Sequence, residues 1–547
     1  MSTTTIAAVA ASTLTAIKLE PIEYPKPPPT SRVNQKPLED LEPQHYPDHS
    51  PETLAGSAAS PISKWQMAII IGTVASVSMI SSLLGGLLIV ALPTMATDIG
   101  LSESLLLWPS SVNALACGCA LLLSGSVADV IDARKVYLTG ASLMTLTTVA
   151  SGLSRTGIEL ILFRAAQGIA LSLTLPSSVI LITRNIPVGS GRNTAFACLG
   201  AAQPVGFSVG LVMGGVFVEN IGWRYGYYIG AILNGAVVVI SIFGVPKTQN
   251  TPPQSYSTIM KRLKSEIDWI GIGLLSTSLG MFSYILSVLA GGASNFPTPA
   301  SLAIFSIAVV LLPMYAYYSL RQEKLGRIVV IPPSIWNSRV FTSLCVTVFI
   351  MWGSFNAIQY FLTLFFQSVQ GLDGLQTSIR FLPMVVTGTI TNFLTGWLVK
   401  RTRADILLLG ATLVTSISPL LLAIVNPEWS YWTCAFFAVS CAPICIDVLF
   451  TVANLVITTV FPHKTHGLAG GVFNTLSNIG NSFGLAITAV IAASVTLSKQ
   501  GNKKSEAEML MDGYRVTFWI CFGGNILALA IIGLGLRKIG KVGIKED

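Results

Sequence analysis

An acidic residue in the middle of a long apolar stretch is the first clue to the chemistry of this chain. Asp447 lies in the stretch 430–461, and Thr451, Asn454 and Thr458 follow it on the same helical face. A carboxylate withdrawn from water can exchange its proton near neutral pH, because apolar surroundings disfavour its charged form. We therefore hypothesise that Asp447 carries the proton of a coupled process. The alternative is a structural carboxylate held by hydrogen bonds.

A basic residue lies inside another apolar stretch, 157–183. A charge within a membrane span costs ~2.5–3.5 kcal/mol, so Arg164 is expected to face a protein interior or a water-filled cavity and to act with Asp447 in proton coupling. Gln167 lies one turn further on the same face and can share its hydrogen bonds. The alternative for Arg164 is a side chain that reaches back to the headgroups.

Neutral amides form two further polar stripes in apolar stretches. One stripe is Trp352, Asn356, Gln359 and Thr363, and the other is Gly470, Asn474, Asn478 and Asn481. Apolar surface with a few amides suits a large amphiphilic ligand, so Gln167, Trp352, Asn356, Gln359, Thr451, Asn454, Asn474 and Asn478 are candidate cavity residues. The same amides could instead join neighbouring helices by hydrogen bonds.

The elements that carry these residues must be membrane-spanning helices. The chain is 52% hydrophobic and 11% charged, with a mean hydropathy of +0.67, whereas soluble domains are about 25% charged. A hydrocarbon core of ~30 Å needs roughly 20 apolar residues in a helix. The sequence therefore predicts an all-α polytopic membrane protein of about fourteen spans. They are 66–93, 105–128, 136–154, 157–183, 194–218, 224–246, 269–290, 299–320, 340–369, 376–399, 405–425, 430–461, 467–496 and 515–536.

Lysine and arginine concentrate on alternate loops and in both tails, for example at Arg134, Lys135, Lys261 and Arg401. The positive-inside rule places those loops and both termini in the cytosol. We expect the plasma membrane, with the vacuolar membrane as the alternative.

An internal repeat divides the spans into two sets. The loop at Gly125, Asp129, Arg134 and Lys135 follows the second span, and a similar basic loop begins at Gly396, after the tenth. The stretch from Pro21 to Pro61 is rich in proline and poor in large aliphatic residues, which predicts a disordered cytosolic tail at 1–64. The repeat predicts a six-helix half at 65–246 and a linker with two inserted helices at 247–330. A second six-helix half at 331–536 and a cytosolic tail at 537–547 would complete the chain.

Small residues recur at every fourth position of the fifth span. Ala202, Gly206, Gly210 and Gly214 would leave one helix face almost bare, so that another helix can pack against its backbone. Pro204 lies within the same span and can serve as a hinge. This bare face could form a contact between two helices that moves during transport. The alternative is ordinary tight packing of the two helices.

At these residues the chain resembles the major facilitator superfamily, and within it the fourteen-span drug/proton antiporters of fungi. The loop Gly125-x-x-Ala128-Asp129, with Arg134 and Lys135, resembles the superfamily's loop motif. Arg164-x-x-Gln167-Gly168 is similar to its fourth-span motif, and the span from Gly200 to Gly215 resembles its antiporter motif, with Gln203 before Pro204. The resemblance implies a latch at Gly125, Asp129, Arg134 and Lys135, and a sealing seam at the fifth span.

One departure concerns coupling. The first span ends Leu84-Gly-Gly-Leu-Leu-Ile89, where family members often have an aspartate at the first position and an asparagine at the sixth. If that acid binds protons in the family, this chain must use another, which favours Asp447.

The sequence carries no phosphate-binding Gly-x-x-x-x-Gly-Lys-Ser/Thr loop, metal cluster or Ser/His/Asp set, so we expect no cofactor and no enzyme activity. The net charge of +8 belongs to membrane loops rather than to a nucleic-acid surface. We expect a monomer in the bilayer that exports hydrophobic or amphiphilic small molecules (drugs, toxins or secondary metabolites) by proton antiport. The alternatives are proton-coupled uptake of a nutrient or siderophore, and a non-transporting receptor.

Overall fold

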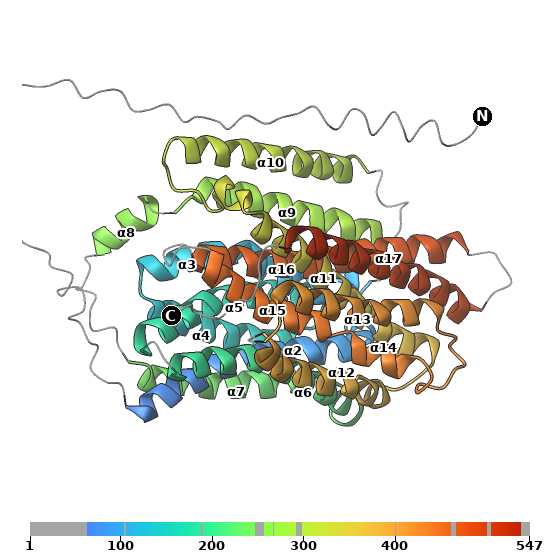
Figure 1. The fold of residues 1–547 in the computed structure, drawn as a ribbon. Coiled ribbons are helices and arrows are strands. Elements are labelled where there is room, and N and C mark those ends of the chain that lie inside the picture. The colour runs from blue at the N-terminus through green and yellow to red at the C-terminus, as the bar shows by residue number, and fades with distance from the viewer. Residues whose placement is uncertain are drawn as a thin grey trace, which may run out of the picture. The chain divides into compact units, whose positions relative to one another are not determined.

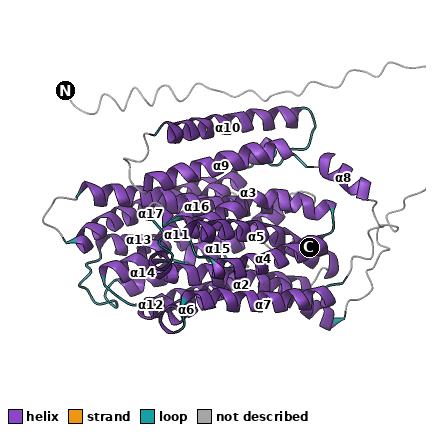
Figure 2. Ribbon diagram, turned by 180° about the vertical axis from the view of Figure 1, so that it is seen from behind, coloured by secondary structure: helices purple, strands orange, loops and turns teal. Residues whose placement is uncertain are grey.

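The computed structural model describes residues 63–102, 105–187, 190–246, 256–265, 267–290, 298–399, 401–460, 466–499 and 505–537. The expected tails at 1–64 and 537–547 lie almost entirely outside these residues. The described residues belong to one unit, Ala59–Asp547, and they form helices without a strand (Figure 2). Fourteen helical segments, two of which comprise two successive helical elements each, are long and apolar enough to cross a membrane, so the predicted number of spans is confirmed.

The first six spans are α2 (Lys64–Asp98), α3 (Trp108–Val130), α4 (Ala133–Leu153), α5 (Gly157–Asn185), α6 (Ser190–Asn220) and α7 (Trp223–Gly244). A short helix, α8 (Tyr256–Ser265), which the sequence analysis did not predict, precedes the inserted pair α9 (Trp269–Ala290) and α10 (Pro299–Lys324). These two helices lie side by side along one edge of the bundle, with α10 outermost (Figure 1).

The second set begins with a short 3₁₀ turn, η4 (Pro333–Asn337). It continues with α11 (Arg339–Leu364), a π-helical turn η5 (Phe365–Val369), α12 (Gly374–Leu398) and α13 (Ala404–Ile424), and ends with α14 (Ala435–Cys441), α15 (Ile444–Val460), α16 (His466–Ser498) and α17 (Glu506–Gly535). The predicted span 430–461 is therefore divided into α14 and α15. Pro443 lies between them, where its missing N–H and its ring disfavour a continuous helix.

Glycine residues form seams that allow close packing of two helices within the first six spans, and of two more within the last six; we call these groups of spans the first and second halves. A Cβ atom added at Gly210 of α6 would lie 2.0 Å from the Leu83 carbonyl oxygen of α2, and one at Gly206 would lie 2.1 Å from that of Met79. In the second half, a Cβ atom at Gly484 of α16 would lie 2.2 Å from the Cα atom of Gly353 in α11. Because α2 and α6 are the first and fifth spans of one set, and α11 and α16 those of the other, the same packing occurs twice.

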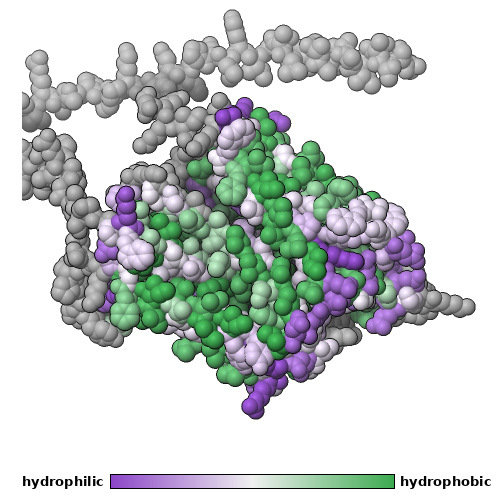
Figure 3. Space-filling model, turned by 90° about the horizontal axis from the view of Figure 1, so that it is seen from below, coloured by the Kyte–Doolittle hydropathy of each residue, from purple (hydrophilic) through white to green (hydrophobic). Residues whose placement is uncertain are grey.

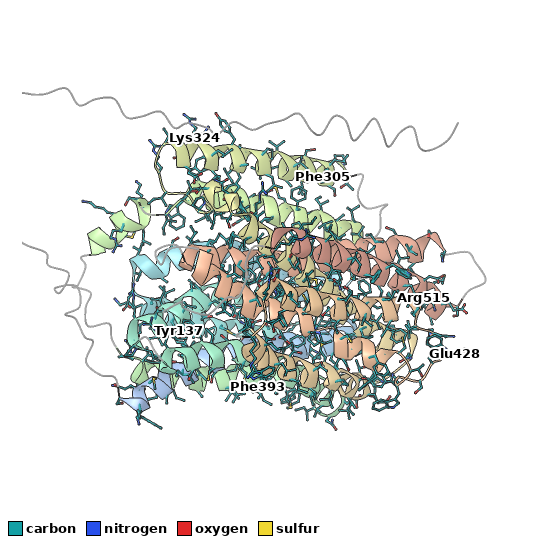
Figure 4. The ribbon with its side chains drawn as sticks, in the orientation of Figure 1. Tyr137, Phe305, Lys324, Phe393, Glu428 and Arg515 are labelled. Atoms are coloured by element: carbon teal, nitrogen blue, oxygen red, sulfur yellow. The ribbon has the colours of Figure 1, made fainter. Side chains whose placement is uncertain are left out.

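The surface agrees with a bilayer environment. Large apolar side chains of the peripheral helices are exposed, among them Phe393 of α12, which is 78% exposed and lies at the edge of the bundle (Figure 4). Figure 3 shows hydrophobic residues across the middle of one face and hydrophilic residues toward its edges. A surface of this kind is stable in hydrocarbon and costly in water.

Candidate functional site

A central cavity of about 280 Å³ lies between the two halves. The first half contributes residues of α2, α3, α5 and α6, and the second half residues of α11, α12, α15 and α16. Of the residues singled out in the sequence, the cavity lining includes Arg164, Pro204, Trp352, Asn356, Gln359, Asp447, Asn474 and Asn478. Side chains from eight helices therefore meet at one place.

Asp447 enters the cavity from the first turn of α15, where its backbone N–H donates to the Pro443 carbonyl at 3.2 Å. The side chain packs against Gly388 of α12, where an added Cβ atom would lie 3.1 Å from Oδ2. Asn392 of α12 interacts with the carboxylate, yet Oδ2 is buried without a hydrogen-bond partner. A buried acceptor left in this state is costly, so the oxygen is suited to receive a proton or a donor group of a ligand.

Arg164 faces the same cavity from α5 and is only 4% exposed. Its Nε donates to the Pro109 carbonyl at 3.1 Å, and its NH1 donates to Gln167 Oε1 at 2.7 Å. None of the ion pairs among the described residues includes Arg164. The guanidinium is thus held in place by neutral acceptors, and its charge is available to a ligand in the cavity.

Gln167 lies behind Arg164 and does not line the cavity. Its Nε2 donates to Thr148 Oγ1 of α4 at 2.7 Å, and the side chain is 1% exposed. This bond orients the amide so that its oxygen faces the guanidinium. Gln167 is therefore a positioning residue for Arg164.

Arg164 and Asp447 lie on corresponding spans of the two halves. α5 is the fourth span of the first set, and α14 with α15 forms the fourth span of the second. Among the described residues, Arg164 and Asp447 are the charged ones that line the cavity. The cavity therefore combines a permanent positive charge on one half with a titratable group on the other.

The amide stripes divide between ligand-facing and helix-joining roles. Asn356 Nδ2 donates to the Asn481 carbonyl at 3.0 Å and so joins α11 to α16. Asn474 and Asn478 each donate within α16, to the carbonyls of Gly470 and Asn474 at 2.9 Å. All three side chains nevertheless line the cavity.

Two candidates on α15 lie away from the cavity. Thr451 Oγ1 donates to the Asp447 carbonyl at 3.2 Å, and neither Thr451 nor Asn454 belongs to the lining. Asn454 is exposed and donates to the Phe450 carbonyl at 2.8 Å. Of the proposed polar stripe, Asp447 lines the cavity and Thr451 and Asn454 do not, while the Thr458 side chain lies outside the described part of the chain.

The lining also includes polar residues that were not among the predicted cavity residues. They are Ser78, Ser81 and Ser82 of α2, with Asn113 of α3 and Gln203 of α6. The three serines recur at the spacing of one helix face, which could have identified them. Asn113 Nδ2 also donates to the Arg164 carbonyl at 3.2 Å.

The candidate latch residues lie at the end of α3 and the start of α4. Arg134 donates from Nε and NH2 to the carbonyls of Val245 and Ile242, at 2.9 and 2.6 Å, at the end of α7. A cation at a helix C-terminus is stabilising. Lys135 is exposed, Gly125 lies near Pro176, and the Asp129 side chain is outside the described part of the chain.

The halves are joined at the end of the bundle where α2 ends and α12 begins, which we call the closed end. Gln367 Nε2 of η5 donates to the Val90 carbonyl of α2 at 3.1 Å. Ser378 Oγ of α12 donates to the Leu211 carbonyl of α6 at 2.6 Å, and the Leu375 N–H donates to Glu219 Oε1 at 2.9 Å. Arg515 and Glu428 lie at this same end (Figure 4).

Comparison with known proteins accounts for this architecture. Residues 74–485 match the family model described as Major Facilitator Superfamily. The chain is 37% identical over 545 residues to "MFS-type transporter 1" of Pyricularia oryzae, covering 91% of this chain and 89% of that protein. It is 25% identical to "Efflux pump terG" of Aspergillus terreus, covering 80% and 82%. It is also 24% identical to "Low affinity ammonium transporter" of Saccharomyces cerevisiae, covering 78% and 79%.

A solved structure with the same fold is that of a bacterial homologue of the human lysosomal transporter Spinster. Its TM-score is 0.57 at 14% sequence identity, with 87% of this chain and 98% of that chain covered. The family match, the all-helical fold with its candidate membrane spans, and the central cavity agree. The chain belongs to the major facilitator superfamily and is an integral-membrane secondary transporter of small molecules, not an enzyme.

Proposed function

We propose that the protein exports hydrophobic or amphiphilic small molecules in exchange for protons. The observation that carries this proposal is the Asp447 carboxylate, which lines the central cavity with one buried oxygen unpartnered. Leu84 and Ile89 occupy positions where related antiporters often have polar groups, so Asp447 is the candidate coupling acid. "Efflux pump terG", "Methylenomycin A resistance protein" and "Aminotriazole resistance protein" are distant relatives whose names support export.

The basic loops support an orientation with both termini in the cytosol, in the plasma membrane. In this orientation the closed end faces outward, and the central cavity takes its substrate from the cytosolic side. Conversion to the outward-open state then requires the bonds from Gln367, Ser378 and Leu375 to break.

The charges of the cavity link the sign of the substrate to the direction of coupling. Protonation of Asp447 leaves Arg164 as the one charge among the described residues of the lining. A cationic or hydrogen-bond-donating substrate competes with the proton for Asp447, and such competition gives antiport. An anionic substrate binds Arg164 best when Asp447 is protonated, and co-binding gives symport.

The energy available is sufficient for export. One proton entering through ~100 mV releases ~2.3 kcal/mol, and each unit of pH adds ~1.4 kcal/mol. One proton exchanged per molecule can therefore sustain roughly a few-hundred-fold gradient of a neutral solute.

The test compares deletion and overexpression strains for growth on a panel of hydrophobic toxicants, with intracellular accumulation measured alongside. We expect overexpression to lower accumulation, and a protonophore or Asp447→Asn to abolish this effect. Asp447→Glu, which keeps a carboxylate, is the matched control and should retain part of the activity at equal surface abundance. Proton-dependent transport that continues unchanged in Asp447→Asn would refute the assignment of Asp447.

Uptake by symport is the second candidate function, and the unpaired Arg164 is the observation that favours it. No carboxylate of the described residues pairs with this buried guanidinium, so it suits an anionic nutrient. Transport assays in both directions with matched anionic and cationic compounds distinguish the two functions: proton-dependent accumulation of an anion supports uptake.

A further inference from the structure

A second pocket, of about 550 Å³, lies toward the closed end. It is formed by the last turns of α2, by Gly100, Leu101 and Leu106 between α2 and α3, by the last turns of α11 and by the π-helical turn η5. Neither the family match nor the names of the relatives assign this pocket a role.

The second pocket continues the central cavity along two helices. On α2, Leu88 and Ile89 line the cavity, and Leu92 and Pro93 line the pocket one turn later. On α11, the stripe Trp352, Asn356 and Gln359 lines the cavity, and its last member, Thr363, lines the pocket. Residues three and four apart share a helix face, so the two spaces lie along the same two faces.

Ile89 lines both spaces and is only 7% exposed. The next residue, Val90, accepts the hydrogen bond from Gln367 of η5 that joins the halves. π-Helical turns are rare and are frequently found at functional sites. The central cavity and the second pocket are therefore separated by the apolar side chain of Ile89. It lies next to the hydrogen bond between Gln367 and Val90, which must break when the closed end opens.

The two spaces differ in their chemistry. The lining of the central cavity includes Arg164 and Asp447, whereas none of the described residues that line the second pocket carries a charge. Its polar groups are the hydroxyls of Thr97, Tyr360, Thr363 and Ser368, and the remainder is apolar or glycine. Such a lining accepts uncharged, partly apolar molecules and disfavours ions, whose desolvation it cannot offset.

We propose that the second pocket is a transit site that holds the substrate after it passes Ile89, and that it selects for uncharged amphiphilic molecules. This inference rests on the proposed export function, because a transit site at this end requires a substrate that moves from the central cavity outward.

Thr97 is a suitable position for a cysteine that reports on the second pocket. It lines the second pocket and is exposed, whereas Thr94, one turn earlier on α2, is also exposed but does not line it. Thr97→Cys and Thr94→Cys are therefore a matched pair. Each is treated in intact cells with an uncharged phenylmaleimide and with its sulfonated, anionic analogue, and the unsubstituted protein controls for reaction at the native cysteines.

For each variant we measure the rate of labelling by the uncharged reagent divided by the rate of labelling by the anionic one. We expect this ratio to be roughly tenfold higher for Thr97→Cys than for Thr94→Cys. Equal reagent preference at the two positions would overturn the assignment of an ion-excluding pocket, and this readout does not depend on any transported compound being known.

The second readout is transport. Phenylmaleimide attached at Thr97→Cys should block export, whereas the same group at Thr94→Cys should not. Full export by completely labelled Thr97→Cys protein would overturn the transit role while leaving the proposed export function intact. Absence of export by the unmodified protein would instead count against the export function, and with it the transit role.

Discussion

At the scale of single residues, Arg164 is held by a geometry that only a planar guanidinium can satisfy. Its Nε and NH1 donate in different directions, to Pro109 and Gln167. A lysine ammonium keeps the charge but is a point charge without the fork, so it cannot reproduce both bonds. We expect Arg164→Lys to lower the transport rate roughly tenfold at unchanged surface abundance.

The measurement is initial efflux of a compound shown to be exported, normalised to the protein at the cell surface. Arg155→Lys, in the loop before α5, is the control that keeps the same chemical change away from the cavity. Transport of Arg164→Lys at the rate of the unsubstituted protein would show that charge alone suffices.

Gly388 gives a second test at this scale, because it sets the space around Asp447. A methyl group there would lie 3.1 Å from Oδ2 and 3.7 Å from the Pro443 Cβ atom, so the carboxylate must shift. We expect Gly388→Ala to fold normally and to alter the pH dependence of transport. Gly396→Ala, on the same helix and with no atom within 4 Å of its added Cβ, should leave the pH profile unchanged. Identical profiles for both variants would mean that the position of the Asp447 carboxylate is not critical.

The polar cavity residues were only partly predictable from the sequence. Asp447, Arg164, Asn356 and Asn474 stood out because charges and amides are rare in apolar spans, and all four line one cavity. Thr451 and Asn454 share the helical face of Asp447, but periodicity does not show how far along that face a cavity extends. The serines of α2 were missed because serine also packs well between helices.

At the scale of helices, the second glycine seam can be compared with an open position on the same helix. Alanine favours a helix over glycine by about 1 kcal/mol, so Gly470→Ala, with no atom within 4 Å, should leave stability unchanged or raised. Gly484→Ala would place a methyl 2.2 Å from the Gly353 Cα atom, and the two helices must separate. We expect a lower thermal midpoint in detergent for Gly484→Ala alone. Equal midpoints would show that the seam is loose.

The turn between α13 and α14 offers a pH-dependent contact. Tyr431 OH donates to the Arg380 carbonyl at 2.7 Å, and burial raises the pKa of this tyrosine to about 12. A raised pKa means that the folded state holds the proton more tightly than the unfolded state does. The contribution of the Tyr431 hydroxyl to the free energy of unfolding is therefore complete below pH ~10 and is lost as the pH rises toward 12. We expect Tyr431→Phe to be less stable at pH 8, with the difference shrinking by pH 11, in thermal melts of purified protein. A difference that stays constant over this range would contradict the contribution of Tyr431.

The seam in the first half was predictable, whereas its counterpart was not predicted. The row Gly206, Gly210 and Gly214 indicated close packing of α6, and its partner proved to be α2. Gly480 and Gly484 have the same spacing in α16, but for that helix the sequence analysis predicted only the cavity-facing asparagines and no glycine seam. Sequence spacing identifies a bare face, and only the fold supplies the helix that covers it.

At the scale of the whole molecule, the repeat of basic loops predicts two sets of six spans with a pair of helices inserted between them. The sequence could not place the inserted pair. In the structure α9 contacts both α3 of the first half and α16 of the second, while α10 packs mainly on α9 (Figure 1). Side chains that contact another membrane helix are mostly apolar, and side chains that face lipid are apolar too. The sequence therefore does not distinguish a helix surface covered by another helix from one covered by lipid.

Alternating access requires the closed end to open, and two residues there allow this motion to be blocked. A Cβ atom at Gly374, the first residue of α12, would lie 3.8 Å from the Val218 Cβ atom of α6. This separation equals the mean for a disulfide. We expect Val218→Cys with Gly374→Cys to cross-link the two halves under mild oxidation and to stop transport, because the closed end can no longer open. Each single variant should remain active under the same oxidation, and a reductant should restore the double variant. A fully cross-linked protein that still transports would exclude an exit between α6 and α12, and substrate would then have to leave elsewhere.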